Sequence, residues 1–164
     1  MAEHQQVGAK LSFGWEKLEA LLREPNLREM IEDYELEHRS PVLAHLPVDI
    51  DWPRLLAQEA SGVYRIWAAR VDGTLAGFIA WYVEPHPYYR TVLFAVDGGH
   101  FLAPAFRNKG RIGWGMWRSA FAALRREGVR FAMPHDSTRR PMTPFLLAFG
   151  AEPLSTWWIL DMSV

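Results

Sequence analysis

The segment His100–Gly115 (HFLAPAFRNKGRIGWG) constrains the fold more than any other part of the chain. Its first residues are typical of a buried strand that ends at Pro104, and a loop rich in glycine and basic residues follows. Gly110–Glu127 then places apolar side chains at helical spacing, and Gly128 is positioned to end that helix. A strand that leads directly into a long helix needs a sheet with helices packed on it, so we expect an α/β or α+β fold.

The other segments predict a mixed, mostly antiparallel sheet flanked by helices. Asp72-Gly73 is a strong hairpin turn between two runs of strand-forming residues. We expect Pro85 and Pro87 to break the chain around His86, and Gly98-Gly99 to form a bulge in the third strand. In chain order, the sequence predicts helices at 15–23, 27–37 and 51–59, strands at 63–71, 75–83, 91–96 with 100–102, and 129–133, a helix at 141–149 and a strand at 154–162.

The length and the even composition predict one domain. The chain has 164 residues, and no repeat, low-complexity tract or long linker divides it. We therefore expect a single domain over 1–164, with a helical N-terminal portion at 1–49 and a core at 50–164.

Composition excludes several classes of protein. Because the chain has no cysteine, disulfides, thiolate catalysis and cysteine-bound metals are excluded, and no metal site is expected. No apolar run reaches the roughly 18 residues of a membrane span, and the first ten residues lack the apolar stretch of a signal peptide. These features predict a cytoplasmic protein that does not contact a membrane.

A near-neutral total charge hides an uneven distribution along the chain. Residues 1–62 carry 12 acidic and 6 basic side chains, whereas residues 63–164 carry 7 acidic and 12 basic ones. The basic excess is strongest within 107–140, which is typical of a solvated helix face or of a site that attracts anions. Binding of nucleic acid through this segment is an alternative, but no known nucleic-acid module supports it, and we expect none to bind.

The loop before the long helix has the chemistry of a phosphate site. Its glycines allow close approach of the backbone, and the free N–H groups of the helix start point into it. The spacing is neither that of a Walker loop nor that of a dinucleotide fingerprint.

On these residues the sequence resembles the GNAT family of acetyl-CoA-dependent N-acetyltransferases. The resemblance lies in Arg107-Asn108-Lys109-Gly110-Arg111-Ile112, which matches most of the family pattern Q/R-x-x-G-x-G/A, and in the order of elements over 50–164. Pro85–Arg90 (PHPYYR) resembles a phage-associated branch. The resemblance implies a V-shaped cofactor opening at the central strand and acetyl transfer from acetyl-CoA to a primary amine of a small molecule or protein.

The resemblance also implies which residues hold acetyl-CoA. Backbone groups at the central strand would hold the pantetheine, and the loop with the helix start would hold the pyrophosphate. The expected cofactor-binding residues are Phe101, Leu102, Ala103, Arg107, Asn108, Lys109, Gly110, Arg111, Ile112 and Gly113. Three positions depart from the family pattern: Ile112 replaces the final glycine or alanine, Ala105 replaces an acidic residue, and Leu146 stands where a tyrosine often acts as general acid.

Acetylation of an amine requires removal of its proton, which a side chain with a pKa near neutral can accept. The catalytic candidates are His86, Asp97 and His100. His86 is held between two prolines, although a surface histidine would look the same. Asp97 precedes the expected bulge, which it would equally support as a turn residue, and His100 fits a satisfied buried histidine as well as a catalytic one.

Two further functional expectations concern activity and assembly. The missing tyrosine favours, as an alternative, a catalytically inactive GNAT-fold protein that binds CoA or serves as a phage-associated structural or interaction protein. Trp157-Trp158 on the expected last strand suggests pairing across a homodimer.

Overall fold

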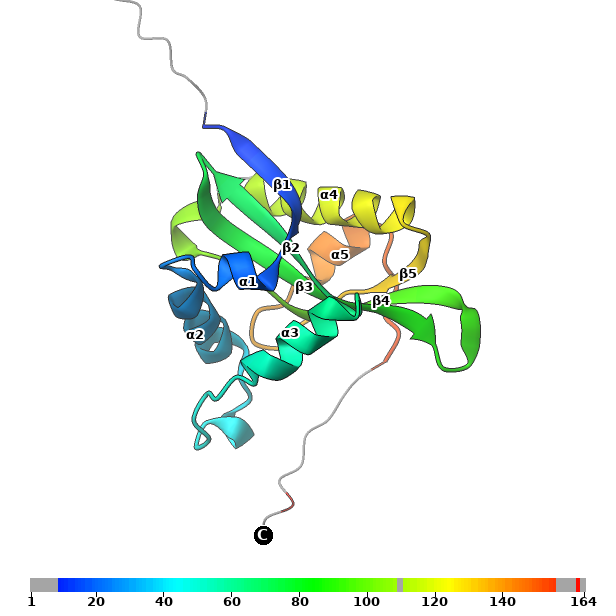
Figure 1. The fold of residues 1–164 in the computed structure, drawn as a ribbon, viewed down its shortest axis with the longest axis horizontal. Helices are drawn as coiled ribbons and strands as arrows, with labels where there is room; N and C mark the ends of the chain where they lie inside the picture. The colour runs from blue at the N-terminus through cyan, green and yellow to red at the C-terminus, as the bar shows by residue number, and fades with distance from the viewer. Residues whose placement is uncertain (1–8, 109–110, 156–161, 163–164) are drawn as a thin grey trace, which may run out of the picture.

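The computed structural model describes residues 9–108, 111–155 and 162, which form a five-stranded sheet with helices on both faces (Figure 1). Neighbouring strands are antiparallel except the last two, which are parallel, as a mixed and mostly antiparallel sheet requires. In sheet order the strands are β1 (Leu11–Glu16), β2 (Tyr64–Val71), β3 (Thr74–His86), β4 (Tyr89–Leu102) and β5 (Val129–Met133).

Each face of the sheet is covered by its own set of helices and its own apolar cluster. Because successive side chains of a strand point to opposite faces, Ile66 packs beneath the first set and Trp67 beneath the second. The first set is α1 (Leu18–Leu21), α2 (Leu27–His38) and α3 (Trp52–Ala60), and the second is α4 (Ile112–Arg126) and α5 (Thr143–Ala148). Two short 3-10 turns lie at Pro41–Leu43 and Pro104–Phe106.

The N-terminal portion is not helical throughout, so the helix expected at 15–23 is wrong in its first part. Trp15 belongs to β1, which pairs with β2, and its ring meets that of Trp67 edge-on at 4.9 Å. The Glu16 carboxylate accepts two hydrogen bonds from Arg70, both at 2.7 Å. Partners more than 50 residues away in sequence thus override the local helical spacing, and only the short α1 remains.

The second hairpin is longer than the prolines suggested. β3 continues through Pro85 to His86 and β4 begins at Tyr89, so the break expected around His86 is a tight turn (Figure 1). The expected interruption of the third strand is a bulge within one continuous strand: Ala80 pairs with Gly99 and Trp81 with Asp97, which leaves Gly98 as the extra residue.

Other predicted elements keep their type with shifted ends. α3 begins where expected, with Asp51 Oδ1 accepting a hydrogen bond from the N–H of Arg54 at 3.0 Å. α4 begins at Ile112, after Lys109 and Gly110, which lie outside the described residues. The strand expected at 154–162 and its Trp157-Trp158 pair fall largely outside the described residues, so the homodimer stays a prediction.

Candidate functional site

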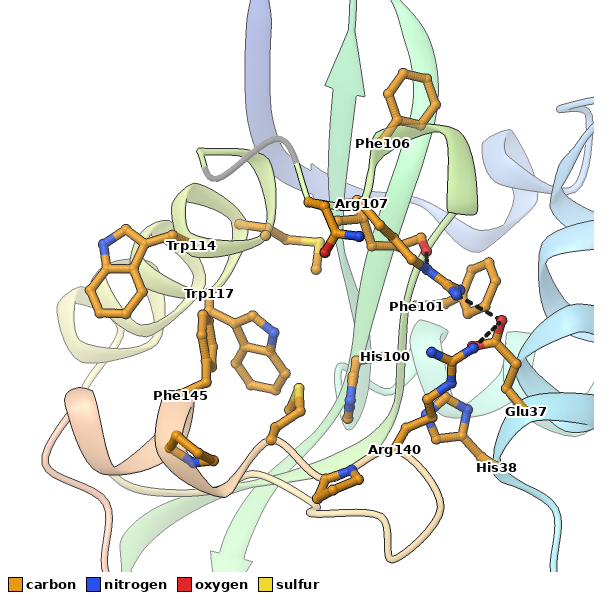
Figure 2. A pocket seen from close by; sticks show the side chains of 17 residues that line it. Glu37, His38, His100, Phe101, Phe106, Arg107, Trp114, Trp117, Arg140 and Phe145 are labelled. Carbon is orange, nitrogen blue, oxygen red and sulfur yellow. Dashed lines mark hydrogen bonds and ion pairs between the residues drawn. The ribbon is translucent and has the colours of Figure 1, made fainter.

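A cleft opens at the point where β4 and β5 part. The two strands pair only from Leu93 to Val96 of β4, and β5 ends at Met133 while β4 runs on to Leu102. The cleft has a volume of about 660 Å³ and is walled by the end of β4, residues 106–108, the first turns of α4, the end of α2 and residues 140–145 (Figure 2). In open sheets, ligands commonly bind in a crevice at the carboxyl ends of the strands, and the parallel strands β4 and β5 diverge at such a place.

The end of β4 presents backbone groups that pair with no strand among the described residues. The N–H of Ala103 donates to the carbonyl of Ala76 at 2.9 Å, so it points toward β3. Because the backbone groups of successive strand residues alternate between the two edges, those of Leu102 and His100 point toward the cleft. Two of the predicted pantetheine residues, Phe101 and Leu102, line the cleft, whereas Ala103 does not.

The wall formed by α4 and α5 is aromatic. Trp114 stacks on Phe149 with ring centroids 4.2 Å apart, and it meets Phe145 edge-on at 5.3 Å. Trp117 meets the His100 ring edge-on at 5.1 Å. This wall suits an apolar chain that carries a few polar groups.

The N-terminus of α4 lies beside the cleft. Among the described residues, the first helical hydrogen bond runs from the N–H of Gly115 to the carbonyl of Arg111, and the N–H groups of the turn before it have no helical partner there. Asn108 lines the cleft with φ +57°, a left-handed conformation that asparagine tolerates, and Gly113 also lines it. Arg111 is exposed and Ile112 is buried, and neither lines the cleft.

Arg107 lines the cleft but is engaged by the protein (Figure 2). Its Nε donates to the carbonyl of Leu102 at 2.6 Å, its guanidinium pairs with Glu37 at 2.8 Å, and it lies over the Phe101 ring at 4.9 Å. Arg140 reaches the same Glu37 carboxylate at 3.4 Å. Glu37 therefore ties α2 to the loop after β4 and to the segment before α5.

Asp97 and His100 form a buried pair at the bulge of β4. The Asp97 carboxylate is fully buried and accepts from His100 Nδ1 at 2.7 Å, from the N–H of Gly99 at 2.7 Å and from the N–H of His135 at 3.1 Å. Since a carboxylate only accepts, His100 Nδ1 carries the hydrogen and Nε2 is left for another partner. His100 lines the cleft, and Asp97 lies behind it.

His86 lies at the turn of the β3–β4 hairpin and does not line the cleft. Its Nδ1 accepts from the N–H of Tyr88 at 3.2 Å, and its ring packs against Phe94 at 4.6 Å. The structure therefore brings together two of the three catalytic candidates, Asp97 and His100, and separates His86 from them.

Sequence reasoning missed the contribution of α2. His38 lines the cleft, its Nδ1 lies 2.9 Å from the carbonyl of Tyr34, and its ring stacks on the Tyr34 ring at 4.7 Å. Burial lowers the pKa of His38 and raises the pKa of Tyr34 to about 12. Glu37 and His38 are the last two residues of the amphipathic helix α2, and nothing in the neighbouring sequence distinguishes them from the residues at an ordinary helix end.

No family model and no curated protein matches the chain, but many solved structures share its fold. A GCN5-related N-acetyltransferase from Ralstonia eutropha JMP134 has a TM-score of 0.67 at 20% identity, covering 94% of this chain and 99% of that one. An aminoglycoside acetyltransferase from an uncultured soil metagenomic sample has a TM-score of 0.66 at 12% identity, covering 93% and 97%. An aminoglycoside N-acetyltransferase in complex with CoA has a TM-score of 0.62 at 19% identity, covering 96% and 97%.

At these identities the likeness establishes the fold. The predicted fold, a single mixed sheet with flanking helices as in GNAT acetyltransferases, is confirmed. The phage-associated branch suggested by Pro85–Arg90 receives no support from these structures. Among the helices that the structure describes, none is long and apolar enough to cross a membrane.

Proposed function

We propose that this protein transfers an acetyl group from acetyl-CoA to a primary amine. The observation that carries the proposal is the cleft at the parting of β4 and β5, where backbone groups of His100 and Leu102 face a volume of about 660 Å³ beside the N-terminus of α4. The fold shared with structures of acetyltransferases, one of them holding CoA, supports it. When bound, acetyl-CoA supplies the thioester carbonyl that the amine attacks.

The residues present fit acetyl-CoA. The groups of β4 that point away from β3, apart from the Leu102 carbonyl that Arg107 already holds, would bind the amides of the pantetheine. The aromatic wall at Trp114 and Trp117 would cover its apolar part. The free N–H groups at the start of α4, with the exposed Arg111, would hold the pyrophosphate. Arg107 would keep the loop in place, because its guanidinium already has two protein partners.

The Asp97–His100 pair would move a proton at the β4 wall. With Nδ1 held by Asp97, His100 presents Nε2, which accepts a proton when the ring is neutral and donates one when it is charged. The carboxylate fixes the tautomer and the orientation of the ring, as a carboxylate does in other histidine pairs. This pair would deliver the proton to the leaving thiolate, a role that the side chain of Leu146 cannot fill.

Binding of acetyl-CoA is the first test. We expect isothermal titration to show binding by the wild-type chain, and amine-dependent thiol release to follow acetyl transfer. Arg111→Glu places a negative charge at the start of α4, and we expect it to weaken acetyl-CoA binding about tenfold. Arg118→Glu changes another exposed arginine, later in the same helix, and is the matched control that should bind as the wild type does. Absence of binding by folded wild-type protein would refute the proposal.

A catalytically inactive CoA-binding protein is the second candidate. Leu146, at the position where the family often has a tyrosine, is 8% exposed on α5 and offers no proton donor. Acetyl-CoA binding without thiol release across a broad panel of amines would favour this candidate over the enzyme.

A further inference from the structure

We propose that His38 is the general base that removes the proton from the acceptor ammonium. The inference rests on the proposed acetyl transfer and adds a residue from α2 that the sequence did not suggest. It places the deprotonation of the amine at His38 on the α2 wall of the cleft, whereas His100, which pairs with Asp97, lies on the β4 wall (Figure 2).

Hydrogen bonding fixes the tautomer of His38. Nδ1 lies 2.9 Å from the carbonyl oxygen of Tyr34, one turn earlier in α2. A carbonyl oxygen only accepts, so Nδ1 carries the hydrogen and Nε2 holds the lone pair. Over the described residues, no protein group forms a hydrogen bond with His38 Nε2. The ring is held further by stacking on Tyr34 at 4.7 Å and 25°.

The surroundings keep His38 neutral before the amine arrives. Burial is the largest cause of its lowered pKa, with smaller contributions from His100 on β4 and His135 after β5, while the bond to Tyr34 and the charge of Glu37 oppose them. Glu37 is itself paired with Arg107 and Arg140, which face the same end of α2. A neutral histidine is the form that accepts a proton.

His38 and His100 are close enough for one to act on the substrate nitrogen while the other acts on the leaving sulfur of the thioester. Their ring centroids are 5.9 Å apart and the rings meet at 73°. Both rings have Nδ1 committed to a fixed acceptor, Tyr34 in one case and Asp97 in the other. Within the part of the chain that the structure describes, neither Nε2 atom has a hydrogen-bond partner, so each can take part in its own proton transfer.

The proton balance of the reaction uses both histidines. His38 Nε2 takes one proton from the ammonium, and the freed lone pair forms the N–C bond to the thioester carbonyl carbon. As the C–S bond breaks, the electron pair leaves with the sulfur, and a second proton from the nitrogen reaches the sulfur by way of His100. The products are an amide, a thiol and a protonated His38, which returns its proton to water.

The test compares His38→Gln with His45→Gln, an exposed histidine of the loop after α2. We expect His38→Gln to lower kcat at least about 100-fold and to abolish the acid limb of the kcat/KM profile, with acetyl-CoA affinity unchanged. His45→Gln should match the wild type in all three. Added imidazole should restore part of the rate to His38→Ala, whose small side chain leaves room for it.

A measurement on the free protein keeps the proposal testable if a variant fails to fold. In ¹⁵N-resolved spectra of the wild-type chain, we expect the His38 ring to carry its hydrogen on Nδ1 and to titrate below the ordinary histidine range. Hydrogen on Nε2, or a folded His38→Gln with wild-type kcat and acid limb, would overturn the role of His38 and leave acetyl transfer standing. A wild-type chain that binds no acetyl-CoA would overturn both proposals.

Discussion

Replacing Asp97 with alanine should loosen the junction of β4 and β5. The Asp97 carboxylate is fully buried and accepts hydrogen bonds from Gly99 within the bulge, from His100 in the cleft and from His135 after β5. Among the described residues, this side chain thus joins the bulge, the cleft wall and the segment that follows β5.

The magnitude follows from these three donors. A hydrogen bond contributes about 1 to 1.5 kcal/mol net, and the loss of a buried acceptor leaves its donors unsatisfied. Loss of three should therefore lower the free energy of unfolding by about 3 to 5 kcal/mol. In a domain of this size each kcal/mol shifts the Tm by about 2 to 4 °C, so we expect a decrease of about 10 °C.

Thermal and urea unfolding, followed by circular dichroism, measure this effect. Asp49→Ala is the matched control, because Asp49 is exposed in a loop and accepts no side-chain hydrogen bond within the described part of the chain. Its Tm should stay within about 1 °C of wild type. A Tm for Asp97→Ala within 3 °C of wild type would refute the argument that this carboxylate holds the junction together.

Three further predictions concern the bulge of β4, the ion pairs of Glu37 and the pH dependence of stability. Gly98→Ala should lower the free energy of unfolding by about 1 to 3 kcal/mol, because its Cβ would lie 2.6 Å from Tyr82 Cε2. Gly14→Ala is the control, because a Cβ there meets nothing within 4 Å, and equal urea midpoints for the two variants would contradict the prediction. Glu37→Ala should lower it by about 1 kcal/mol through the loss of the pairs with Arg107 and Arg140, while the exposed Glu32→Ala should leave it unchanged in the same measurement. Burial lowers the pKa of His38 in the folded state, so its contribution to stability is complete above the unfolded pKa of about 6.5 and is lost as pH falls through the folded value. Unfolding curves from pH 7 to 5 should therefore show a smaller decrease in the free energy of unfolding for His38→Gln than for the wild type.

Local pattern was sufficient wherever one segment determines its own structure. The Asp72-Gly73 turn, the bulge at Gly98-Gly99 and the cap at Asp51 all depend on residues adjacent in sequence, and each was predictable. β1 was not, because its identity as a strand comes from pairing with β2 and from the contact of Trp15 with Trp67. A helical spacing of apolar residues is outweighed when a sheet edge offers a complete set of hydrogen bonds.

The same distinction divides the candidate site. The end of β4 and the start of α4 are contiguous in sequence, and the family-like pattern marks their place at the cleft. His38 enters the cleft from α2 only because α2 packs against β4, and nothing near it in sequence carries that information. The prolines that flank His86 suggested a rigidly held catalytic side chain, but His86 lies at the turn of the β3–β4 hairpin and does not line the cleft.

The uneven charge of the chain gains a structural meaning at the cleft. Acidic residues of the first 62 positions pair with arginines that follow them: Glu16 and Glu24 with Arg70, and Glu37 with Arg107 and Arg140. Within the basic segment 107–140, two arginines therefore face the carboxylate of α2 instead of forming a continuous surface, which weakens the case for nucleic acid.

This pairing also limits how strongly the acidic residues of positions 1–62 can attract a cationic acceptor. Among the described residues that line the cleft, Glu37 is the only one with a carboxylate, and it pairs with the guanidiniums of Arg107 and Arg140. A cationic acceptor would therefore gain little attraction inside the cleft, and any attraction would come from the outer carboxylates of α2, such as Glu29 and Glu32. Attraction between exposed charges is screened over about 10 Å at 0.1 M salt, so it should affect the KM of a cationic acceptor only at low ionic strength. It should not change kcat, which we expect to depend on His38 and His100.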